Sequence, residues 1–345
     1  MVLLVGAALT ITMAGVRAAS GIISMVFLAL ILTITVHPVR AWLRRKGVPS
    51  IVTSVIMLVA VYLILIVVIL MLVVSIGRLA TLLPTYTPQI QDYIDRVGEW
   101  LAEQGVGQQQ VDAVIDSFDV GSLVGIATDV LSTSLGIASD TFFLAVLLLF
   151  MAFDTTKTTQ ALAMLREHRP DFVDGLRAFA IGTRSYMAVS AGFGAIVAII
   201  DAALLMVMGV PGAFVWGVLA FVTNFIPNIG FVIGVVPPAL IGLLEGGPGL
   251  MIGVIVMYSV VNFVIQSVIQ PRIVGDRVGL SATVTFLSLV FWAFILGPMG
   301  ALLAVPATLL CRGLLIDADP ASRWVLPLVS GKAQTPEEIE AGYQA

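Results

Sequence analysis

Few residues in this sequence could take part in chemistry, and Asp201 has the strongest physical argument. Between Arg184 and Glu245 it is the only charged residue in a long apolar stretch. A carboxylate inside hydrocarbon is costly, and such residues usually have a function. Desolvation favours the neutral form of a carboxyl group, so Asp201 is a candidate proton carrier. The alternative is an interfacial aspartate that binds backbone groups or water.

A polar stripe lies within a later apolar segment, residues 250–269 and the position after it. Three side-chain amides recur at every fourth position, with a serine one turn earlier: Asn262, Gln266, Gln270 and Ser259. Residues with this spacing share one face of a helix. Because amides that face lipid would lack partners, the stripe is expected to face protein or a solute pathway. Hydrogen bonds that simply join helices are the alternative.

Two Pro/Gly breaks interrupt apolar segments in the second half of the chain. Their sequences are Asn224-Phe-Ile-Pro227-Asn228-Ile-Gly230 and Gly297-Pro298-Met-Gly300. Half-helices that begin at such breaks present free N–H groups and positive dipole ends, which suit a polar or anionic solute. Turn geometry alone is the alternative.

The composition places these residues in a membrane. Of the 345 residues, 59% are hydrophobic and 11% are charged, and the mean hydropathy is +1.08. Soluble domains carry roughly 25% charged residues and could not bury so much apolar surface. The sequence therefore predicts an all-α polytopic membrane protein with about eight membrane segments. The net charge of −4 gives no reason to expect a nucleic-acid partner.

Residues 1–77 are predicted to form the N-terminal membrane helices. The first sixteen residues are apolar and follow no basic stretch, so we interpret them as a membrane helix rather than a cleaved signal. A second segment, 18–36, is expected to break at His37-Pro38, and a third covers the charge-free residues 47–77. The positive-inside rule places the loop between them in the cytoplasm, because it holds four cations: Arg40, Arg44, Arg45 and Lys46.

Residues 78–139 are acidic and amphipathic. They contain eight acidic residues and two arginines, and apolar residues recur at helical spacing from Ile90 to Leu101. This pattern predicts an amphipathic helical region on the extracytoplasmic side. A solvated acidic cap is the simplest interpretation, and an oligomer contact or a solute vestibule are the alternatives.

Residues 140–316 are predicted to form the transport core, with a fourth segment that leaves the membrane at Asp154 and a cytoplasmic tail over 317–345. A straight span through either break would leave unpaired backbone groups in hydrocarbon. We therefore expect two helical hairpins, residues 211–244 and 281–315. The charged loops make these hairpins enter from opposite faces, as in an inverted repeat, and place both termini in the cytoplasm. Two kinked ordinary spans are the alternative.

The sequence lacks the motifs of common catalytic sites. Its two histidines, His37 and His168, lie in predicted loops, and the single cysteine, Cys311, lies in an apolar run. Zinc-protease, nucleophile-elbow and phosphate-loop motifs are absent. We therefore expect a protein that is not an enzyme, with no catalytic residue, cofactor or metal.

Several stretches resemble one known family. They are the run from Gln270 to Ser281, Leu287-Ser-Leu-Val-Phe-Trp292, Phe225-Ile-Pro-Asn-Ile-Gly230, Gly297-Pro-Met-Gly300 and Ala304-Val-Pro306. With them the chain resembles the autoinducer-2 exporter family of bacterial permeases over nearly its whole length. The resemblance implies a multi-pass inner-membrane protein that exports a small solute as a homo-oligomer, for which we expect a pentamer.

Together these observations predict a transporter that exports a small polar solute or signalling molecule such as autoinducer-2, with a proton gradient as the candidate driving force. Its expected partners are the solute and membrane lipid. The resemblance also implies another activity, because some members of the family are credited with cation/proton exchange. Relatives often carry an acidic residue where this chain has Gln266 and Gln270, which weakens the case for cation coupling here. A cation/proton antiporter and a passive channel are the alternatives; nothing favours a scaffold. The residues assigned to the pathway or to coupling are Asp201, Asn224, Pro227, Asn228, Gly230, Asn262, Gln266, Gln270, Gly297, Pro298 and Gly300.

Overall fold

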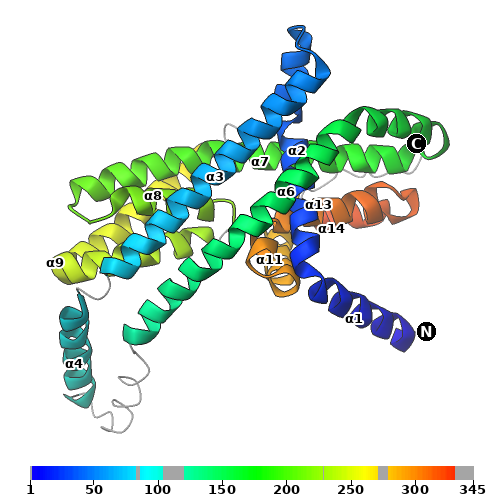
Figure 1. Ribbon diagram of the computed structural model, residues 1–345. Coiled ribbons are helices and arrows are strands. Elements are labelled where there is room, and N and C mark those ends of the chain that lie inside the picture. Colours follow the sequence, from blue (N-terminus) through cyan, green and yellow to red (C-terminus); the bar gives the residue numbers. More distant parts are fainter. Residues whose placement is uncertain (1, 83–85, 104–119, 228, 271–278, 331–345) are drawn as a thin grey trace.

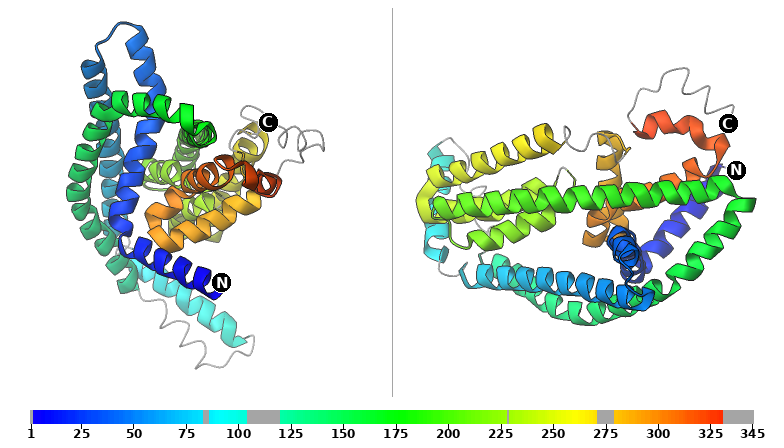
Figure 2. Two further views of the ribbon diagram at one scale, coloured as in Figure 1. Left: turned by 90° about the vertical axis from the view of Figure 1, so that its right-hand side faces the viewer. Right: turned by 90° about the horizontal axis from the view of Figure 1, so that it is seen from above.

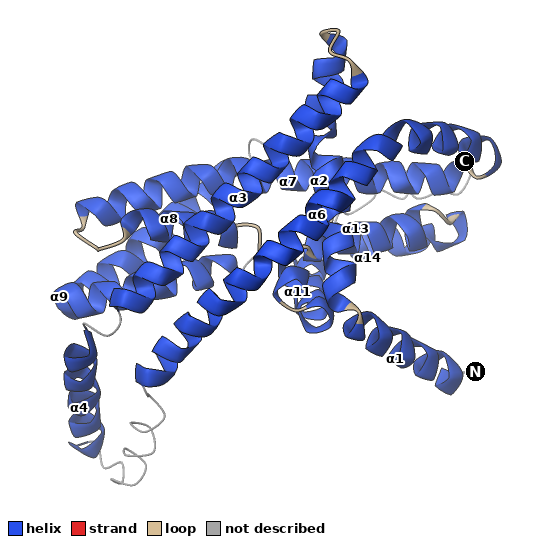
Figure 3. Cartoon of the chain, viewed as in Figure 1, coloured by secondary structure: helices blue, strands red, loops and turns tan. Residues whose placement is uncertain are grey.

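The regular structure of the described chain is helical throughout. The computed structural model describes residues 2–82, 86–103, 120–227, 229–270 and 279–330, and every regular element in these ranges is a helix (Figure 3). The all-α prediction is confirmed. Within the described chain, four helices are long and apolar enough to cross a membrane, and a bent pair in α6 would make a fifth.

The first half of the chain forms a group of long helices. These are α1 (Val2–Ala18), α2 (Ser20–Arg45), α3 (Ser50–Leu82) and α6 (Val120–His168), with the polar α4 (Thr87–Glu103) between the last two. In Figures 1 and 2, α3 and α6 run side by side. They meet α2 in a hydrophobic cluster of Ala29, Val61, Leu144 and Leu148. Helix α1 projects away from this group (Figure 1).

One expected helix end in this half is wrong. Helix α2 continues through Pro38 to Arg45, so the sequence His37-Pro38 does not break it. A proline inside a membrane helix removes only one N–H donor, and neighbouring helices can accommodate the loss. Helix α6 continues past Asp154, the residue at which the fourth segment is expected to leave the membrane. It bends there by 57° between Thr141–Asp154 and Lys157–His168, and the predicted boundary at residue 139 lies inside it.

In the second half, the long α7 (Pro170–Val207) packs against α8 (Ala213–Thr223) and α9 (Gly230–Asn262), which continues into the π-helical turn η2 (Phe263–Ile269). Helix α9 reverses direction at Gly247, whose φ is 74° and ψ −170°. Gly242 lies against Leu250 and Val254. In a straight helix, Gly242 and Val254 would be about 18 Å apart, so the two arms of α9 must fold back on each other.

The last helices form a second folded-back pair. They are α11 (Ala282–Leu296), the short α12 (Pro298–Leu302) and α13 (Ala304–Arg312), followed by η3 (Gly313–Asp317), η4 (Pro320–Val325) and α14 (Leu326–Ser330). Trp292 Nε1 donates a 3.0 Å hydrogen bond to Thr308 Oγ1, which donates a 2.7 Å bond to Ser288. These bonds join α11 to α13 across the break at Gly297.

The outer surface of these helices is strongly apolar. Val207 is 85% exposed, Ile199 is 69% exposed and Phe294 is 65% exposed. Such side chains are poorly solvated by water, whereas the hydrocarbon chains of lipids solvate them well. The exposed apolar surface and the long apolar helices together indicate a membrane protein.

Candidate functional site

Asp201 is completely buried in the middle of the second half. It lies on α7 with 0% of its surface exposed, and neither carboxylate oxygen has a hydrogen-bond partner among the described residues. Burying a carboxylate without partners is very costly unless a proton, an ion or water compensates. The site therefore calls for a proton or a polar species beside this side chain.

A small polar cavity adjoins the Asp201 carboxylate. Its walls come from α7, α8 and both arms of α9 with η2: Val197, Asp201, Ala220, Thr223, Asn224, Phe231, Gly234, Tyr258, Asn262 and Gln266. Its volume is about 10 Å³, close to the roughly 10–15 Å³ that one water molecule requires. In this conformation the cavity is too small for an organic solute.

Three amide side chains form a hydrogen-bonded network along one wall. Gln266 Nε2 donates to Asn224 Oδ1 at 2.9 Å and to Asn262 Oδ1 at 2.7 Å. Asn224 Nδ2 donates to the Ser190 carbonyl of α7 at 3.0 Å. A Cβ at Gly194 would lie 2.8 Å from Asn224 Nδ2, so this glycine lets Asn224 approach α7. The network connects three elements distant in sequence.

Four of the residues assigned from the sequence thus line one cavity: Asp201, Asn224, Asn262 and Gln266. Gln270 is half-buried and does not line it. The intervening η2 turn is π-helical, with more residues per turn than an α-helix, so a spacing of four no longer keeps one face. Ser259, also assigned to the stripe, is exposed and donates its hydroxyl hydrogen to the Ile255 carbonyl at 2.7 Å.

Sequence reasoning missed Tyr258 and Thr223. Tyr258 is 1% exposed, and its hydroxyl has no hydrogen-bond partner among the described residues. It precedes Asn262 by four positions, so the stripe of amides continues to Tyr258 rather than to Ser259. That spacing was the available signal. Thr223 enters the cavity because it ends α8 directly before Asn224.

The two breaks pack in the same manner. A Cβ at Gly230 would lie 1.9 Å from the Thr223 carbonyl oxygen, and a Cβ at Gly300 would lie 1.9 Å from that of Trp292. Each half-helix therefore begins against the carbonyl of the helix before it, which only glycine permits. At the second break Gly297 has a φ of 68°, and Pro298 takes the first helical position of α12.

The breaks also reach a shared part of the core. Phe225 of the first break and Met299 of the second pack against one cluster that includes Tyr186 and Leu303. Tyr186 donates a 2.8 Å hydrogen bond to the Phe225 carbonyl. Pro227, Gly230, Gly297, Pro298 and Gly300 do not line the Asp201 cavity, and Asn228 lies outside the described residues.

A separate contact holds the start of α4 against the second half. The Tyr86 hydroxyl donates a hydrogen bond to a Glu245 carboxylate oxygen beside the reversal in α9. Burial, together with this hydrogen bond and the Glu245 charge, raises the pKa of Tyr86 to about 12. Tyr86 also packs in a cluster with Leu205 and Val210, so the amphipathic region is attached near the end of α7.

Comparison with known proteins identifies the family. The family model described as AI-2E family transporter matches residues 4–317. YhhT of Escherichia coli K12, named provisionally as a transport protein, is 29% identical over 334 residues, covering 97% of this chain and 95% of YhhT. TqsA of the same organism, named an AI-2 transport protein, is 30% identical over 307 residues and 88% of each chain. A Haemophilus influenzae protein also named provisionally for transport is 26% identical over 326 residues and 91% of each chain. The chain therefore belongs to the AI-2E family of transporters.

Proposed function

We propose that this protein exports a small polar solute of the autoinducer-2 kind across the inner membrane, and that Asp201 carries the coupling proton. The observation that carries this proposal is the buried Asp201 carboxylate beside a polar cavity. Both of its oxygens lack hydrogen-bond partners among the described residues, in a protein whose family consists of transporters. The name of TqsA supports the choice of solute.

The amide network suits a solute rich in hydroxyl groups. Asn224, Asn262 and Gln266 offer both donors and acceptors around the cavity, and Tyr258 adds a hydroxyl. Because the cavity is closed to an organic molecule at about 10 Å³, solute entry requires the helices around it to move. The proposed mechanism is alternating access, in which a solute replaces the amide hydrogen bonds and protonation of Asp201 changes with the opening direction.

The proposed membrane arrangement follows the sequence expectations. It has about eight membrane segments, with hairpins 211–244 and 281–315 as an inverted repeat within a transport core of residues 140–316. Both termini and the 317–345 tail are cytoplasmic, residues 78–139 are extracytoplasmic, and the protein works as a homo-oligomer, with a pentamer as our proposal. The similar packing of Gly230 and Gly300 supports the repeat. Gln270, Pro227, Asn228, Gly297 and Pro298 remain proposed pathway residues.

The test is flux of autoinducer-2 in proteoliposomes, with and without an imposed pH gradient. We expect the gradient to accelerate transport in the wild type and to have no effect in Asp201→Asn. Glu99→Gln makes the same acid-to-amide change at an exposed site on α4 and should keep the wild-type response. Equal gradient dependence in wild type and Asp201→Asn would end the proton role. Wild-type flux that does not change when the pH gradient is imposed would favour a passive channel.

A cation/proton antiporter is the second candidate function. The observation in its favour is the set of oxygen atoms around the cavity, because carboxylate, amide and hydroxyl oxygens are the ligands of hard cations. The same proteoliposomes loaded with sodium or potassium ions distinguish the two functions. Proton release driven by a cation gradient, without autoinducer-2 flux, would replace the export proposal.

A further inference from the structure

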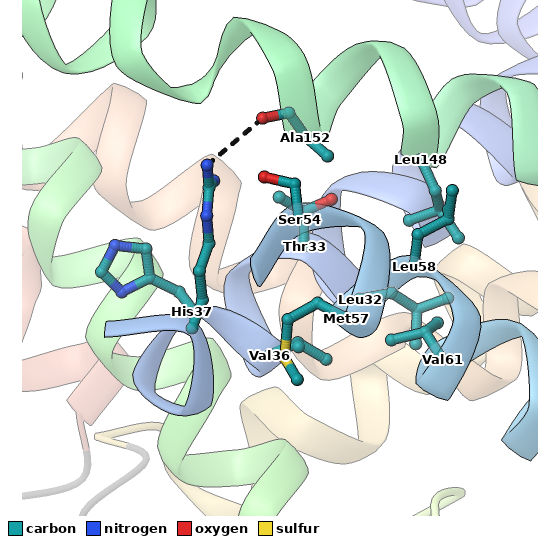
Figure 4. A pocket seen from close by; sticks show the side chains of 11 residues that line it. Leu32, Thr33, Val36, His37, Ser54, Met57, Leu58, Val61, Leu148 and Ala152 are labelled. Carbon is teal, nitrogen blue, oxygen red and sulfur yellow. Dashed lines mark hydrogen bonds between the residues drawn. The ribbon is translucent and has the colours of Figure 1, made fainter. Parts of the chain in front are cut away.

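A second pocket lies in the first half of the protein, away from the Asp201 cavity. It is formed where α2, α3 and α6 meet, has a volume of about 50 Å³, and shares no lining residue with that cavity. The residues of its walls that matter here are Leu32, His37, Arg40, Leu58, Val61 and Ala152. Figure 4 shows His37 at one end of the pocket and Leu58, Val61 and Leu148 at the other.

Arg40 is the unusual residue of this pocket. Only 9% of its surface is exposed, and its Nε has no hydrogen-bond partner among the described residues. Nη2 reaches the Ala152 carbonyl at 3.4 Å, a long contact drawn as the dashed line in Figure 4. No acidic side chain in the described ranges forms an ion pair with Arg40. A buried guanidinium without a counter-charge is costly and calls for an anion.

Other positive charges surround the same position. The Arg40 and Arg184 guanidinium groups both act electrostatically on the His37 imidazole, and Arg184 Nε donates to the Ile34 carbonyl of α2 at 3.3 Å. Arg44, Arg45 and Lys46 follow on the exposed end of α2 and its loop. The local field therefore favours an anion at the end of the pocket that contains Arg40.

The remainder of the pocket is apolar. Leu32, Leu58 and Val61 form its walls away from the charges, so an occupant would bring a charged group and a hydrocarbon part. An anionic phospholipid has this chemistry, and basic pockets between membrane helices are known to bind such headgroups. A guanidinium is also well shaped for phosphate oxygens, because its N–H groups form a planar fork.

We propose that this pocket binds the phosphate of an anionic phospholipid through Arg40, with the start of an acyl chain against Leu58 and Val61. The occupant would join α2, α3 and α6 at the basic end of α2. This binding does not depend on the proposed transport function, because the pocket and the Asp201 cavity have separate walls.

The test measures thermal stability of the purified full-length protein in detergent during titration with phosphatidylglycerol, phosphatidylcholine or inorganic phosphate. We expect phosphatidylglycerol to raise the melting temperature of the wild type, as a ligand of the folded state should, and phosphatidylcholine to have little effect. Arg40→Gln should weaken the apparent affinity for phosphatidylglycerol by roughly tenfold. Arg45→Gln removes an exposed charge from the same helix and should leave the affinity unchanged.

A second variant covers the case in which Arg40→Gln does not fold. Leu58→Phe leaves every charge in place and fills the apolar end, and it should also weaken phosphatidylglycerol binding. Native mass spectrometry of the wild type should retain phosphatidylglycerol in preference to phosphatidylcholine. Equal affinity in wild type and Arg40→Gln would overturn the proposal, as would equal retention of the two lipids. Stabilisation by inorganic phosphate alone, lost in Arg40→Gln, would replace the lipid with a free anion.

Discussion

The side chain of Gln266 lies between Asn224 and Asn262 and donates hydrogen bonds to both, at 2.9 Å and 2.7 Å. Asn224 follows α8 at the first break, whereas Gln266 belongs to η2, beyond the reversal at Gly247. One amide therefore joins the break to the helix that follows it, beside Asp201. Any movement of the break relative to η2 must rearrange these bonds.

Replacing Gln266 with leucine should impair both folding stability and transport. The change leaves Asn224 Oδ1 and Asn262 Oδ1 without their donor in a partly buried site, at a cost of about 1–3 kcal/mol. We expect a lower melting temperature and slower autoinducer-2 flux in proteoliposomes. For the stability measurement, Gln270→Leu is the matched control, because Gln270 is half-buried outside the cavity. If the two variants lose equal stability, the hydrogen bonds of Gln266 to Asn224 and Asn262 do not stabilise the folded protein.

A single methyl group added at Gly230 or Gly300, the glycines of the two breaks, should strongly reduce both stability and transport. A Cβ at Gly230 or Gly300 would overlap a carbonyl oxygen at 1.9 Å, so the half-helix must shift, at a cost of roughly 1–3 kcal/mol or more. Gly230→Ala and Gly300→Ala should lose thermal stability and transport. Gly192→Ala, on α7 with nothing within 4 Å of its Cβ, should be neutral or stabilising. Wild-type behaviour of both break variants would contradict the close packing.

Tyr86→Phe should destabilise the protein by about 1 kcal/mol, because it removes the hydrogen bond to Glu245. The pKa of Tyr86 is raised from 10.0 to about 12, so the folded protein holds this proton more tightly than the unfolded chain does. Its contribution to stability is present below pH 10 and is lost as the pH rises through about 12.

The measurement for Tyr86 is ultraviolet titration of the phenol groups, together with melting temperature at several alkaline pH values. The wild type should show one more late-ionising tyrosine than Tyr86→Phe. Tyr62→Phe, which removes a phenol hydroxyl from α3, is the control for the general effect of such a change. A Tyr86 that ionises at the ordinary tyrosine pH would show that the Glu245 contact does not form.

The proposed topology predicts opposite labelling of two exposed positions. In a Cys311→Ala background, Glu99→Cys on α4 should react with a membrane-impermeant thiol reagent in intact cells, because residues 78–139 are proposed to be extracytoplasmic. Arg45→Cys at the end of α2 should react only after the cells are lysed, as the positive-inside rule requires. The reverse pattern would invert the proposed orientation.

The sequence by itself determined the properties that depend on composition and local spacing. An apolar, weakly charged chain must form helices in a membrane, so the all-α class and membrane location could be predicted. The Pro/Gly breaks at Gly230 and Gly297 could also be predicted, because glycine and proline change the backbone at their own positions in the sequence. Asp201 stood out because a lone carboxylate in an apolar stretch is costly wherever it packs.

Only the tertiary structure decided which of these residues meet. Asp201, Asn224 and Gln266 come from three elements, and their contact depends on the reversal at Gly247 and on how α8 packs against α7. The π-helical turn η2 has more residues per turn than an α-helix. Gln270 therefore does not lie on the helix face that lines the Asp201 cavity, whereas Tyr258 does. Helix α2 continues through Pro38, and the Tyr86 hydroxyl donates a hydrogen bond to Glu245, which lies 159 residues further along the chain. Such outcomes depend on packing between distant helices, which local sequence patterns do not specify.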